Sequence, residues 1–555
     1  MEKTASYIKL IENSIRKHWD LDAFTDYKAS TLQYKDVARK IEKLHIIFKE
    51  CGIKRGDRIA LCDKNSSLWG SAFFAILTYG AIAVPILHEF TTEQIYNILR
   101  DSGSRLFFTN DKIWRKLNAD EMPDIEGVIH IEDYSLLLSR TEELTYARMH
   151  LNELFGKKYP MNFRSHHISY EAEEPEDIVL INYTSGSTGY SKGVMVPYRA
   201  LLSNFEFACN AIPLKPGDHV LSMLPMAHMY GLAFEVTYEF CIGCHVYFLT
   251  RIPSPRIVLE AFSEVKPAII ISVPLIMEKI IRKRVFPRID NSKIRIMMRM
   301  PIIGDKIKKK IKDELIKALG GNFYEVIIGG AALNQEVEMF LHFIDFPYTV
   351  GYGATECAPI ISYADYKSFK PGSCGKAALN MEVKIDSAHP ETEVGEILAK
   401  GPNVMKGYYK APELTEQVID KDGWYHTGDL GVMDSDGNIT IKGRSKNMLL
   451  GSSGQNIYPE EIEDKLSSMV LVNECLVIQK GDRLYALIHP DMEEAKAQNL
   501  SESDIQTIME ANRKELNAFL PNFSQIAGFK IMDEEFEKTP KKSIKRFLYQ
   551  NMELN

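Results

Sequence analysis

The sequence predicts an α/β protein with at least two domains. Short runs of valine and isoleucine alternate with segments of helical periodicity, which is typical of layered α/β structure. The chain has 555 residues, whereas a single hydrophobic core stops growing at about 250–300 residues. The composition changes near residue 443, where a polar segment rich in Gly and Ser begins. We therefore expect a large N-terminal domain, with room for three packed lobes, and a C-terminal domain of ordinary size.

The overall charge and the apolar segments argue against several classes of protein. The formal net charge is −8 at pH 7, which opposes general nucleic-acid binding because that function favours a basic surface. The first residues form an amphipathic pattern of mixed charge without an apolar run, so we expect no signal peptide. The most apolar stretch, residues 70–87, contains Gly80 and Pro85, which predict a buried helix followed by a strand rather than a membrane span.

The eight cysteines are scattered along the chain. Cys241 and Cys244 have the spacing of a C-x-x-C pair, but no second pair accompanies them. A lone pair in an apolar segment is typical of buried packing, with a metal or redox role as the alternative. The distribution favours a reducing compartment, and we expect a cytoplasmic protein.

Residues 183–194 read YTSGSTGYSKGV, a run of glycines and hydroxyl side chains that ends in lysine and glycine. Glycine lets backbone N–H groups approach an anion closely, and Lys192 adds a mobile charge. The P-loop pattern fails, because Ser191 stands where its second glycine belongs and Gly193 where its Ser or Thr belongs. A flexible linker is opposed by the apolar segments on both sides. The run therefore predicts a phosphate-holding loop after a strand, with hydroxyl donors from Ser185, Ser187, Thr188 and Ser191.

The pattern of residues 322–356 predicts a βαβ unit. Its strands are expected at Tyr324–Ile328 and Pro347–Val350, with Asn334 as the N-cap of the helix between them. The apolar helix face comprises Val337, Phe340, Leu341 and Ile344. The loops after both strands of such a unit open at the same sheet edge, where ligands bind. We therefore expect one loop, Gly329, Gly330 and Ala331, to lie beside the other, Gly353, Ala354, Thr355 and Glu356.

The segment GYGATE carries side chains that suit a nucleoside triphosphate. Tyr352 offers a flat face for adenine, Thr355 a phosphate donor and Glu356 a hard ligand for Mg²⁺. A simple turn is an equal alternative for this segment alone.

Three other segments carry polar side chains on predicted loops. In WYHTGDLG, Asp429 follows a tight turn, and its carboxylate can either hold a ribose diol or cap that turn. In GRSK, Arg444 offers a planar fork for ribose or phosphate oxygens. In LPMAHMYGL, His228 lies on a loop after a short strand, although a lone histidine is more often a core residue.

Taken in order, these segments resemble the motifs of the adenylate-forming family. The order is YTSGSTGYSKG, LPMAHMYG, GGAAL, GYGATE, GEILAKGPNVMKGYY, WYHTGDLG, GRSKN and PEEIE. The family contains acyl- and aryl-CoA synthetases, luciferases and the adenylation domains of peptide synthetases, and the resemblance covers nearly the whole chain. It implies an N-terminal domain of two α/β layered sheets plus a β-barrel-like subdomain, and a small mobile α+β C-terminal domain. The expected boundaries are residues 1–443, a hinge at 444–446, and residues 447–555.

The resemblance also implies a reaction. The family joins a carboxylate to ATP, which gives acyl-AMP and pyrophosphate, and a thiol, usually of coenzyme A, then attacks the mixed anhydride. Adenylation gives a poor electrophile a good leaving group, so catalysis is mainly positioning and charge stabilisation. The cofactors implied are ATP and Mg²⁺, with coenzyme A as co-substrate.

The resemblance assigns roles to the motif residues. Tyr352 would stack near adenine, Asp429 would hold the ribose with Arg444 nearby, and Lys446 would be the hinge. His228 would lie near the carboxylate or gate the thiol tunnel, and the segment with Gly454 and Asn456 would meet the nucleotide or pantetheine. The catalytic set is Thr188, Lys192, His228, Glu356 and Lys542, with Glu356 as the metal ligand. The nucleotide-binding set is Thr184, Ser185, Gly186, Ser187, Thr188, Gly189, Lys192, Gly329, Gly330, Ala331, Tyr352, Gly353, Thr355, Glu356, Asp429 and Arg444.

Two positions depart from the family pattern. Ser191 replaces a common proline, which should loosen the loop slightly. The C-terminal motif of the family resembles P-K-T-x-x-G-K-I-x-R, and FEKTPKKSIKR places Ser543 at the register of its functional lysine. A missing transition-state donor costs about 3 kcal/mol, or roughly a hundredfold in rate. We expect Lys542 to substitute by a one-residue slip, the alternatives being Lys541, Lys545 or slow adenylation.

A basic segment lies between Lys279 and Lys317, with fourteen Lys or Arg against four Asp or Glu. Ile307, Ile311 and Leu315 have helical spacing, so this is a basic amphipathic helix. Its charged face is either simply solvated or docks to anionic lipid or an acidic carrier protein.

Three functions fit the sequence. The first is a ligase that joins a medium- or long-chain fatty acid to coenzyme A, because the connector after Lys446 is one residue longer than in aryl-CoA ligases. The second passes the acyl group to acyl carrier protein. The third is a nucleotide-binding homologue that lost turnover at Ser543. The expected partners are the acid, ATP and coenzyme A, with carrier protein and peripheral membrane contact as open alternatives.

Overall fold

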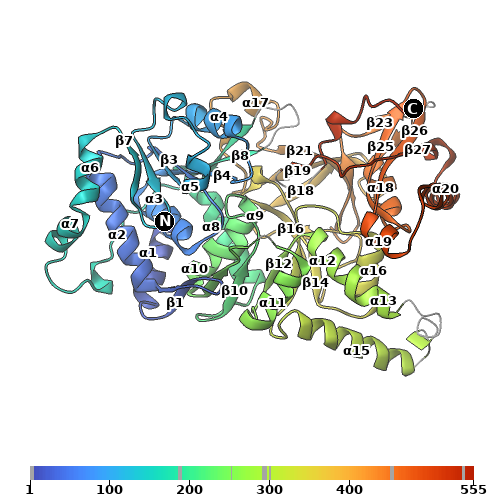
Figure 1. Ribbon diagram of the computed structural model, residues 1–555, viewed down its shortest axis with the longest axis horizontal. Helices are drawn as coiled ribbons and strands as arrows, with labels where there is room; N and C mark the ends of the chain where they lie inside the picture. The colour runs from blue at the N-terminus through green and yellow to red at the C-terminus, as the bar shows by residue number, and fades with distance from the viewer. Residues whose placement is uncertain are drawn as a thin grey trace.

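The computed structural model describes residues 6–184, 191–251, 253–289, 297–298, 300, 302–450, 455–539 and 544–554. β-Sheets flanked by helices make up its larger part, and the C-terminal residues form a separate lobe at one end of the long axis (Figure 1). The predicted α/β class with a separate C-terminal domain is therefore confirmed.

An eight-stranded sheet forms the N-terminal layer, in the order β20-β9-β8-β4-β3-β5-β6-β7. On one face, Ile59 and Leu61 share a hydrophobic cluster with α2 (Tyr34–Glu50) and α3 (Ser67–Tyr79). On the other face, Ala60 and Cys62 share a cluster with α4 (Thr92–Ser102). Covering on both faces is typical of parallel sheets. The strands are β3 (Arg58–Cys62), β4 (Ile82–Ile86), β5 (Leu106–Thr109), β6 (Gly127–His130), β7 (Leu136–Ser139), β8 (Ile178–Thr184), β9 (Lys192–Pro197) and β20 (Gly407–Tyr408).

The apolar stretch at residues 70–87 folds as the sequence predicts. The buried helix α3 ends at Gly80, which adopts a left-handed conformation with φ 81° and so suits glycine. The strand β4 follows and includes Pro85. No helix within the described part of the chain is long and apolar enough to cross a membrane.

A second α/β layer contains two sheets joined by a parallel bridge between Val220 and Ile269. One sheet has the order β10-β11-β1-β2 and the other the order β12-β13-β14. Its strands are β1 (Asp22–Asp26), β2 (Thr31–Gln33), β10 (His219–Ser222), β11 (His245–Phe248), β12 (Ile270–Ser272), β13 (Val326–Ile328) and β14 (Tyr348–Val350).

The predicted βαβ unit is confirmed in this layer. The strands β13 and β14 are parallel neighbours, and α16 (Gln335–Phe343) connects them with Asn334 as its N-cap. The cap side chain accepts a hydrogen bond from the Val337 amide, and the predicted inner face is buried at Val337 and Leu341.

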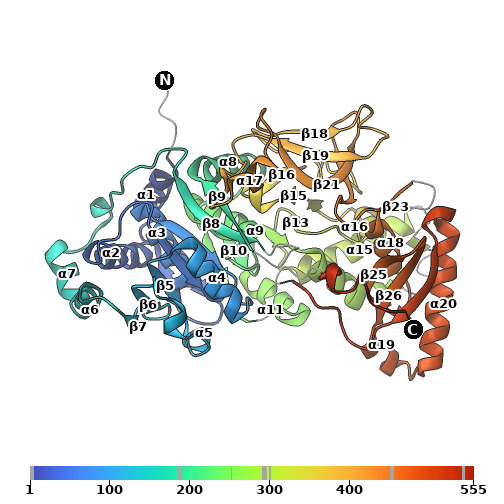
Figure 2. The same cartoon turned by 90° about the horizontal axis from the view of Figure 1, so that it is seen from above.

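Antiparallel strands form a third part of the N-terminal domain, grouped beside the α/β layers in Figure 2. The orders are β15-β16-β17 and β18-β19-β21-β22. These sheets occupy the place of the expected barrel-like subdomain. The strands are β15 (Tyr352–Gly353), β16 (Ile360–Tyr363), β17 (Lys376–Ala377), β18 (Glu382–Asp386), β19 (Gly395–Lys400), β21 (Tyr425–Met433) and β22 (Ile439–Arg444).

The C-terminal lobe has its own core around the sheet β25-β26-β27. Ile462 and Leu466 of α18 pack there with Met509 of α20. The helix α18 begins at Pro459, which stands at its first helical position. The elements are β23 (Leu449–Leu450), β24 (Asn456–Ile457), α18 (Pro459–Ser467), β25 (Val472–Lys480), β26 (Arg483–Pro490), α19 (Met492–Ala497), α20 (Glu502–Phe519) and β27 (Ile526–Ile531).

Further helices cover the layers. The basic amphipathic helix is confirmed as α15 (Ile303–Ala318), in which Leu315 is buried and Ile307 and Ile311 are partly buried. The others include α1 (Tyr7–Lys17), α6 (Glu142–Met149), α7 (Leu151–Lys158), α8 (Tyr198–Ala211), α9 (Met229–Leu232), the π-helical turn η3 (Ala233–Thr237), α10 (Tyr238–Ile242), α11 (Pro255–Val265), α12 (Pro274–Ile280), the π-helical turn η4 (Ile281–Val285), α13 (Phe286–Ile289) and α17 (Pro412–Glu416).

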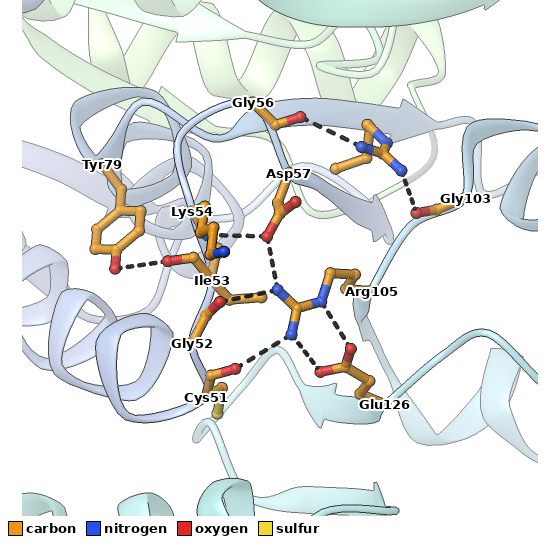
Figure 3. Close-up of polar contacts among 11 residues, drawn as sticks. Cys51, Gly52, Ile53, Lys54, Gly56, Asp57, Tyr79, Gly103, Arg105 and Glu126 are labelled. Carbon is orange, nitrogen blue, oxygen red and sulfur yellow. Dashed lines mark hydrogen bonds and ion pairs between the residues drawn. The ribbon is translucent and has the colours of Figure 1, made fainter.

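An arginine network secures the start of β5 (Figure 3). The Arg105 guanidinium lies 2.6 Å from the Asp57 carboxylate and 2.7 Å from that of Glu126. It also donates to the backbone carbonyls of Cys51, at 3.2 Å, and Gly52, at 3.0 Å. One side chain thus ties the end of α2 to β3, β5 and β6. Charge-assisted bonds of this kind are stronger than neutral ones.

Candidate active site

The strands that flank the glycine-rich run are antiparallel neighbours. Thr184, the last residue of β8, pairs with Lys192, the first residue of β9. The predicted phosphate-binding residues between them, Ser185, Gly186, Ser187, Thr188 and Gly189, lie outside the described residues. Thr184 and Lys192 therefore mark the sheet edge at which the site is built.

A tyrosine connects Lys192 to Glu356. Strand β20 pairs with β9 and places Tyr408 opposite Val194. The Lys192 Nζ lies 4.9 Å from the centre of the Tyr408 ring. The Tyr408 hydroxyl donates a hydrogen bond of 2.9 Å to Glu356 Oε1. A cation and a carboxylate thus both contact one aromatic side chain, which holds them near the start of β9.

Asp429 lies between Tyr352 and Arg444. The Tyr352 hydroxyl donates to Asp429 Oδ2 at 2.7 Å, and Arg444 Nε is 3.0 Å from Oδ1. The Asp429 side chain is 8% exposed and that of Arg444 is 67% exposed, so the acid is inside and the arginine faces solvent. Burial raises the pKa of the Asp429 carboxyl, and the nearby Arg444 guanidinium opposes this shift. Glu356 is close enough to raise the same pKa further.

The turn before Asp429 is stabilised from β19 rather than by the Asp429 side chain. The Gly428 amide donates to Glu396 Oε1 at 2.8 Å, and Thr427 Oγ1 donates to the Ile397 carbonyl at 2.8 Å. The Asp429 amide donates to Thr427 Oγ1 at 3.0 Å. Because these contacts satisfy the turn, the Asp429 carboxylate is directed to Tyr352 and Arg444 instead of capping its own turn.

The two loops of the βαβ unit meet, as predicted. Strand pairing places Ile328 opposite Val350, and the Gly351 amide donates to the Ile328 carbonyl at 2.9 Å. The loop that begins at Gly329 is therefore adjacent to the one that contains Tyr352.

Close approach of neighbouring atoms favours glycine at position 329 and requires it at position 353. A Cβ atom at Gly329 would lie 3.0 Å from Cζ of Tyr230. A Cβ atom at Gly353 would lie 2.2 Å from the Pro359 carbonyl oxygen. Gly330 has φ +87°, a conformation that L-residues rarely adopt. Gly330 and Ala331 are exposed, whereas Thr355 is buried.

His228 lies on a loop that bridges two strands of different sheets. Its ring accepts a hydrogen bond from the Tyr230 amide at 3.3 Å and caps α9. Asn182 of β8 donates to the Ala227 carbonyl at 2.9 Å, and the Tyr230 hydroxyl donates to the Ile327 carbonyl at 3.1 Å. His228 is half-buried rather than a core residue. Its loop contacts both β8, which precedes the glycine-rich run, and β13, which precedes the turn at Gly329–Ala331, called the Gly329 turn below.

Comparison with known proteins identifies the family. The AMP-binding enzyme family matches residues 11–409, and the C-terminal domain family of AMP-binding enzymes matches residues 446–552. The chain belongs to the AMP-binding enzyme family. It is an enzyme of the acyl- or aryl-CoA ligase class, for which ATP and Mg²⁺ are the cofactors and coenzyme A is the co-substrate. The predicted family and enzyme class are confirmed.

Relatives differ in the acid that their names specify. The long-chain-fatty-acid–CoA ligase of Escherichia coli is 26% identical over 490 residues, which cover 83% of this chain and 81% of that protein. A probable 4-coumarate–CoA ligase 2 of Dictyostelium discoideum is 29% identical over 472 residues, covering 80% and 78%. The O-succinylbenzoate CoA synthetase of Bacillus subtilis, solved with ATP and magnesium, has a TM-score of 0.75 at 21% identity and covers 98% of this chain and 99% of that one.

The C-terminal domain of this AMP-binding enzyme packs against the βαβ unit. Asn334 caps α16 with its side-chain oxygen Oδ1. Its side-chain nitrogen Nδ2 donates to Ser468 Oγ at 2.7 Å and to Asp464 Oδ1 at 3.1 Å, both in the C-terminal domain. Arg282 donates to the Ser467 carbonyl at 3.0 Å. The helix α18 is thus held to the domain that carries the Gly329 turn.

The predicted hinge begins at the end of a strand. Arg444 is the last residue of β22, and Lys446 is exposed. Asn447 donates to Glu460 Oε1 of α18 at 2.6 Å. Lys446 therefore lies between a residue paired in the N-terminal sheet and one that contacts the C-terminal lobe.

Several predicted residues of the C-terminal domain lie outside the described residues, namely Gly454, Lys541, Lys542 and Ser543. Asn456 is exposed at the start of β24. Lys545 lies 3.1 Å from Glu537 Oε2 in an ion pair. Lys545 is therefore paired with an acid of its own domain.

Two residues of this site were missed by sequence reasoning, Tyr408 and Glu396. Both lie in the motif GEILAKGPNVMKGYY, which supports the family resemblance without indicating a role for either. Tyr408 reaches Glu356 because a two-residue strand pairs with β9. Such pairing between distant short segments has no local sequence signal.

Proposed function

We propose that this enzyme uses ATP to convert a medium- or long-chain fatty acid into acyl-AMP and pyrophosphate, and then transfers the acyl group to the thiol of coenzyme A. The observation that carries the proposal is that Lys192 and Glu356 share Tyr408, and that Glu356 is close enough to Asp429 to raise the pKa of its carboxyl. These three charged groups match the phosphates, the metal and the ribose of a magnesium nucleotide.

Each charged group has a distinct task in the proposed mechanism. The Asp429 carboxylate accepts ribose hydroxyl donors, and Lys192 places a positive charge beside the phosphates. Magnesium held jointly with phosphate oxygens needs only one or two carboxylates, and Glu356 fits as one such ligand. When bound, the ion neutralises charge that develops on the phosphates.

The bond changes follow from the chemistry of adenylation. A carboxylate oxygen of the acid attacks the α-phosphorus, and the bond to the β-phosphate oxygen breaks as pyrophosphate leaves. The thiolate sulfur then attacks the acyl carbon, and AMP leaves with the bonding electron pair. We assign His228 to the acid or thiol side of the cleft, because its loop contacts the Gly329 turn through Tyr230.

The fatty-acid assignment is supported by the relatives named as long-chain-fatty-acid–CoA ligases and by the long connector after Lys446. Acid-dependent ATP–pyrophosphate exchange should be measured with octanoate, palmitate and 4-coumarate, followed by assay of the thioester product. We expect exchange with the fatty acids. Exchange with 4-coumarate alone would overturn the substrate class, and no exchange with a broad panel of acids would favour the nucleotide-binding homologue.

A basic surface supports a second acceptor or a surface partner. Four lysines of α15 are exposed on its outward side, namely Lys306, Lys309, Lys310 and Lys317. This face suits an acidic carrier protein or an anionic membrane. Thioester assays with coenzyme A and with holo-carrier protein separate the two acceptors, and co-sedimentation with anionic vesicles tests peripheral membrane contact. All eight cysteines are free thiols, which supports a cytoplasmic location as part of the proposal.

We further propose domain boundaries at residues 1–443 and 447–555, with residues 444–446 as the hinge and Lys446 as its pivot. Two half-reactions in one cleft need two poses of the small domain. Proline at Lys446 restricts φ, so Lys446→Pro should preserve acyl-AMP formation while slowing thioester formation. Asn334→Ala tests the contact to α18 in the same assays. Equal slowing of both half-reactions by Lys446→Pro would contradict the hinge.

A further inference from the structure

The loop that carries His228 is anchored by polar side chains that the proposed mechanism does not use. The strand β10 ends at Ser222, and α9 begins at Met229. Between them, the backbone is bonded to side chains of Asn65, Asn182 and Glu235, which come from three other parts of the chain. A short loop could connect β10 to α9 without hydrogen bonds from three separate side chains.

Glu235 holds the point at which the loop leaves the sheet. Its side chain is fully buried within the π-helical turn η3. Its Oε2 accepts hydrogen bonds from the amides of Met223, at 3.1 Å, and Leu224, at 3.0 Å. Burial raises the pKa of this carboxyl well above its ordinary value, and the two amide bonds oppose that shift. Single π-helical turns occur frequently at functional sites.

Asn65 and Asn182 hold the rest of the loop. Asn65 Nδ2 donates to the Leu224 carbonyl at 2.6 Å, and its Oδ1 accepts from the Met226 amide at 2.9 Å. Asn182 donates to the carbonyl of Ala227, the residue before the histidine, at 2.9 Å. The amide side chains therefore bond the loop on both its donor and acceptor groups.

The far end of the loop is held through Tyr230. The Tyr230 hydroxyl donates to the Ile327 carbonyl at 3.1 Å. The Tyr230 ring also fills the space where a Cβ atom at Gly329 would lie 3.0 Å from Cζ. A displacement of the loop would thus move His228 and change the shape of the Gly329 turn together. Misplacement of a reacting group by about 1 Å can cost about 100-fold in rate.

We propose that Glu235 and Asn65 are positioning residues, which hold the loop so that His228 and Tyr230 face the Gly329 turn. This inference rests on the proposed function, because it names residues that act through His228 in the same site. Neither residue contacts the reacting atoms, and each acts through backbone groups of residues 223–226.

Glu239 provides a matched comparison within the same continuous helix. It lies four residues after Glu235 and is equally buried, and burial raises the pKa of its carboxyl to about 8. Neither of its carboxyl oxygens has a hydrogen-bond partner among the described residues. A buried acid in this helix is therefore not in itself an anchor, and the two bonds to the loop distinguish Glu235.

The test uses Glu235→Gln, Glu235→Leu and Asn65→Ala, with Glu239→Gln as the control. Acyl-AMP formation and thioester formation from supplied acyl-AMP are measured in the full chain, each also in the His228→Ala background. Glutamine keeps a carbonyl acceptor, so we expect rates within about threefold of the parent. We expect Glu235→Leu and Asn65→Ala to slow, by up to about 100-fold, the same step that His228→Ala slows.

Non-additivity is the decisive readout. If the anchors act through the histidine, Glu235→Leu should slow the affected step by less than about threefold in the His228→Ala background. Equal losses in both backgrounds would show a purely structural role and overturn the proposal. If Glu235→Leu does not fold, the same comparison is made with Asn65→Ala, because Asn65 is only half-buried.

Hydrogen exchange separates failure of this inference from failure of the proposed function. We expect faster exchange at residues 223–230 in Glu235→Leu, with little change at β11. Unchanged exchange in the loop would overturn the anchoring even if the enzyme activates fatty acids. Faster exchange in a protein that activates no acid would retain the anchoring and reject the function.

Discussion

The replacement Asp429→Asn tests the nucleotide site most directly. The substitution keeps the volume of the side chain but removes the charge that faces Arg444 at 3.0 Å. It also weakens the acceptor that ribose hydroxyls would use. A hydrogen bond to a charged group contributes about 1.5–3 kcal/mol, which corresponds to roughly a 10- to 150-fold change in an equilibrium constant. We therefore expect the KM for ATP to rise by a factor in that range.

The effect on stability should be small by comparison. The Arg444 side chain is 67% exposed, so its ion pair with Asp429 is screened by solvent. Removing the buried charge also removes its desolvation cost. We expect the free energy of unfolding to change by less than about 1 kcal/mol, measured by denaturant titration. A large loss of stability with unchanged KM would assign Asp429 a structural role.

Deoxygenated nucleotides identify the contact itself. Acid-dependent pyrophosphate exchange is measured with ATP, 2′-deoxy-ATP and 3′-deoxy-ATP for the parent and for Asp429→Asn. The parent should discriminate against at least one deoxy nucleotide by about tenfold or more, and the variant should lose that discrimination. Equal discrimination by both proteins would refute the ribose contact.

The pH dependence of the KM for ATP tests the role of Asp429 independently of the nucleotide analogues. Burial raises the pKa of Asp429 above its ordinary value, and the ionised form is the one that pairs with Arg444. The KM for ATP should therefore rise as pH falls through this raised pKa, and Asp429→Asn should lack that limb of the profile.

Three further predictions concern other parts of the molecule. Tyr408→Phe removes the 2.9 Å hydrogen bond to Glu356 and should lower kcat for acyl-AMP formation about five- to tenfold, whereas an unchanged kcat would show that the ring alone suffices. Lys542→Ala should slow acyl-AMP formation about 100-fold and Lys541→Ala far less, and equal near-normal rates for both would reject the one-residue slip. Arg105→Ala should lower the free energy of unfolding by about 2–3 kcal/mol without changing the KM for ATP, and a loss below about 1 kcal/mol would make its network no stronger than a surface one.

The sequence predicts elements whose physical signal is local. Asn334 has a short polar side chain directly before an apolar helical repeat, and it caps α16. The glycine at position 80 predicts the end of α3, because a left-handed residue there stops the helix. The boundary with the C-terminal domain is likewise indicated by a change from strand pattern to polar connector.

Contacts between distant segments could not be predicted in this way. The link from Tyr408 to Glu356 depends on a strand of two residues, and the support of Gly428 by Glu396 depends on pairing of β19 with β21. That the Asp429 carboxylate does not cap its own turn also needed coordinates, because it depends on what else satisfies the turn. The roles that the family resemblance assigns to side chains stay predictions, and Gly454 and Lys542 among them lie outside the described residues.

The contact between Gly329 and the Tyr230 ring has a consequence for the diversity of this family. A Cβ atom at position 329 would lie 3.0 Å from Cζ of Tyr230, so a larger side chain there must displace this ring. Enlargement at 329 should be accompanied by a smaller ring or an aliphatic side chain at 230, and the pair should vary together across homologous genes. Under the proposed function, such paired exchange would reshape the acid side of the site without changing Asp429 or Glu356.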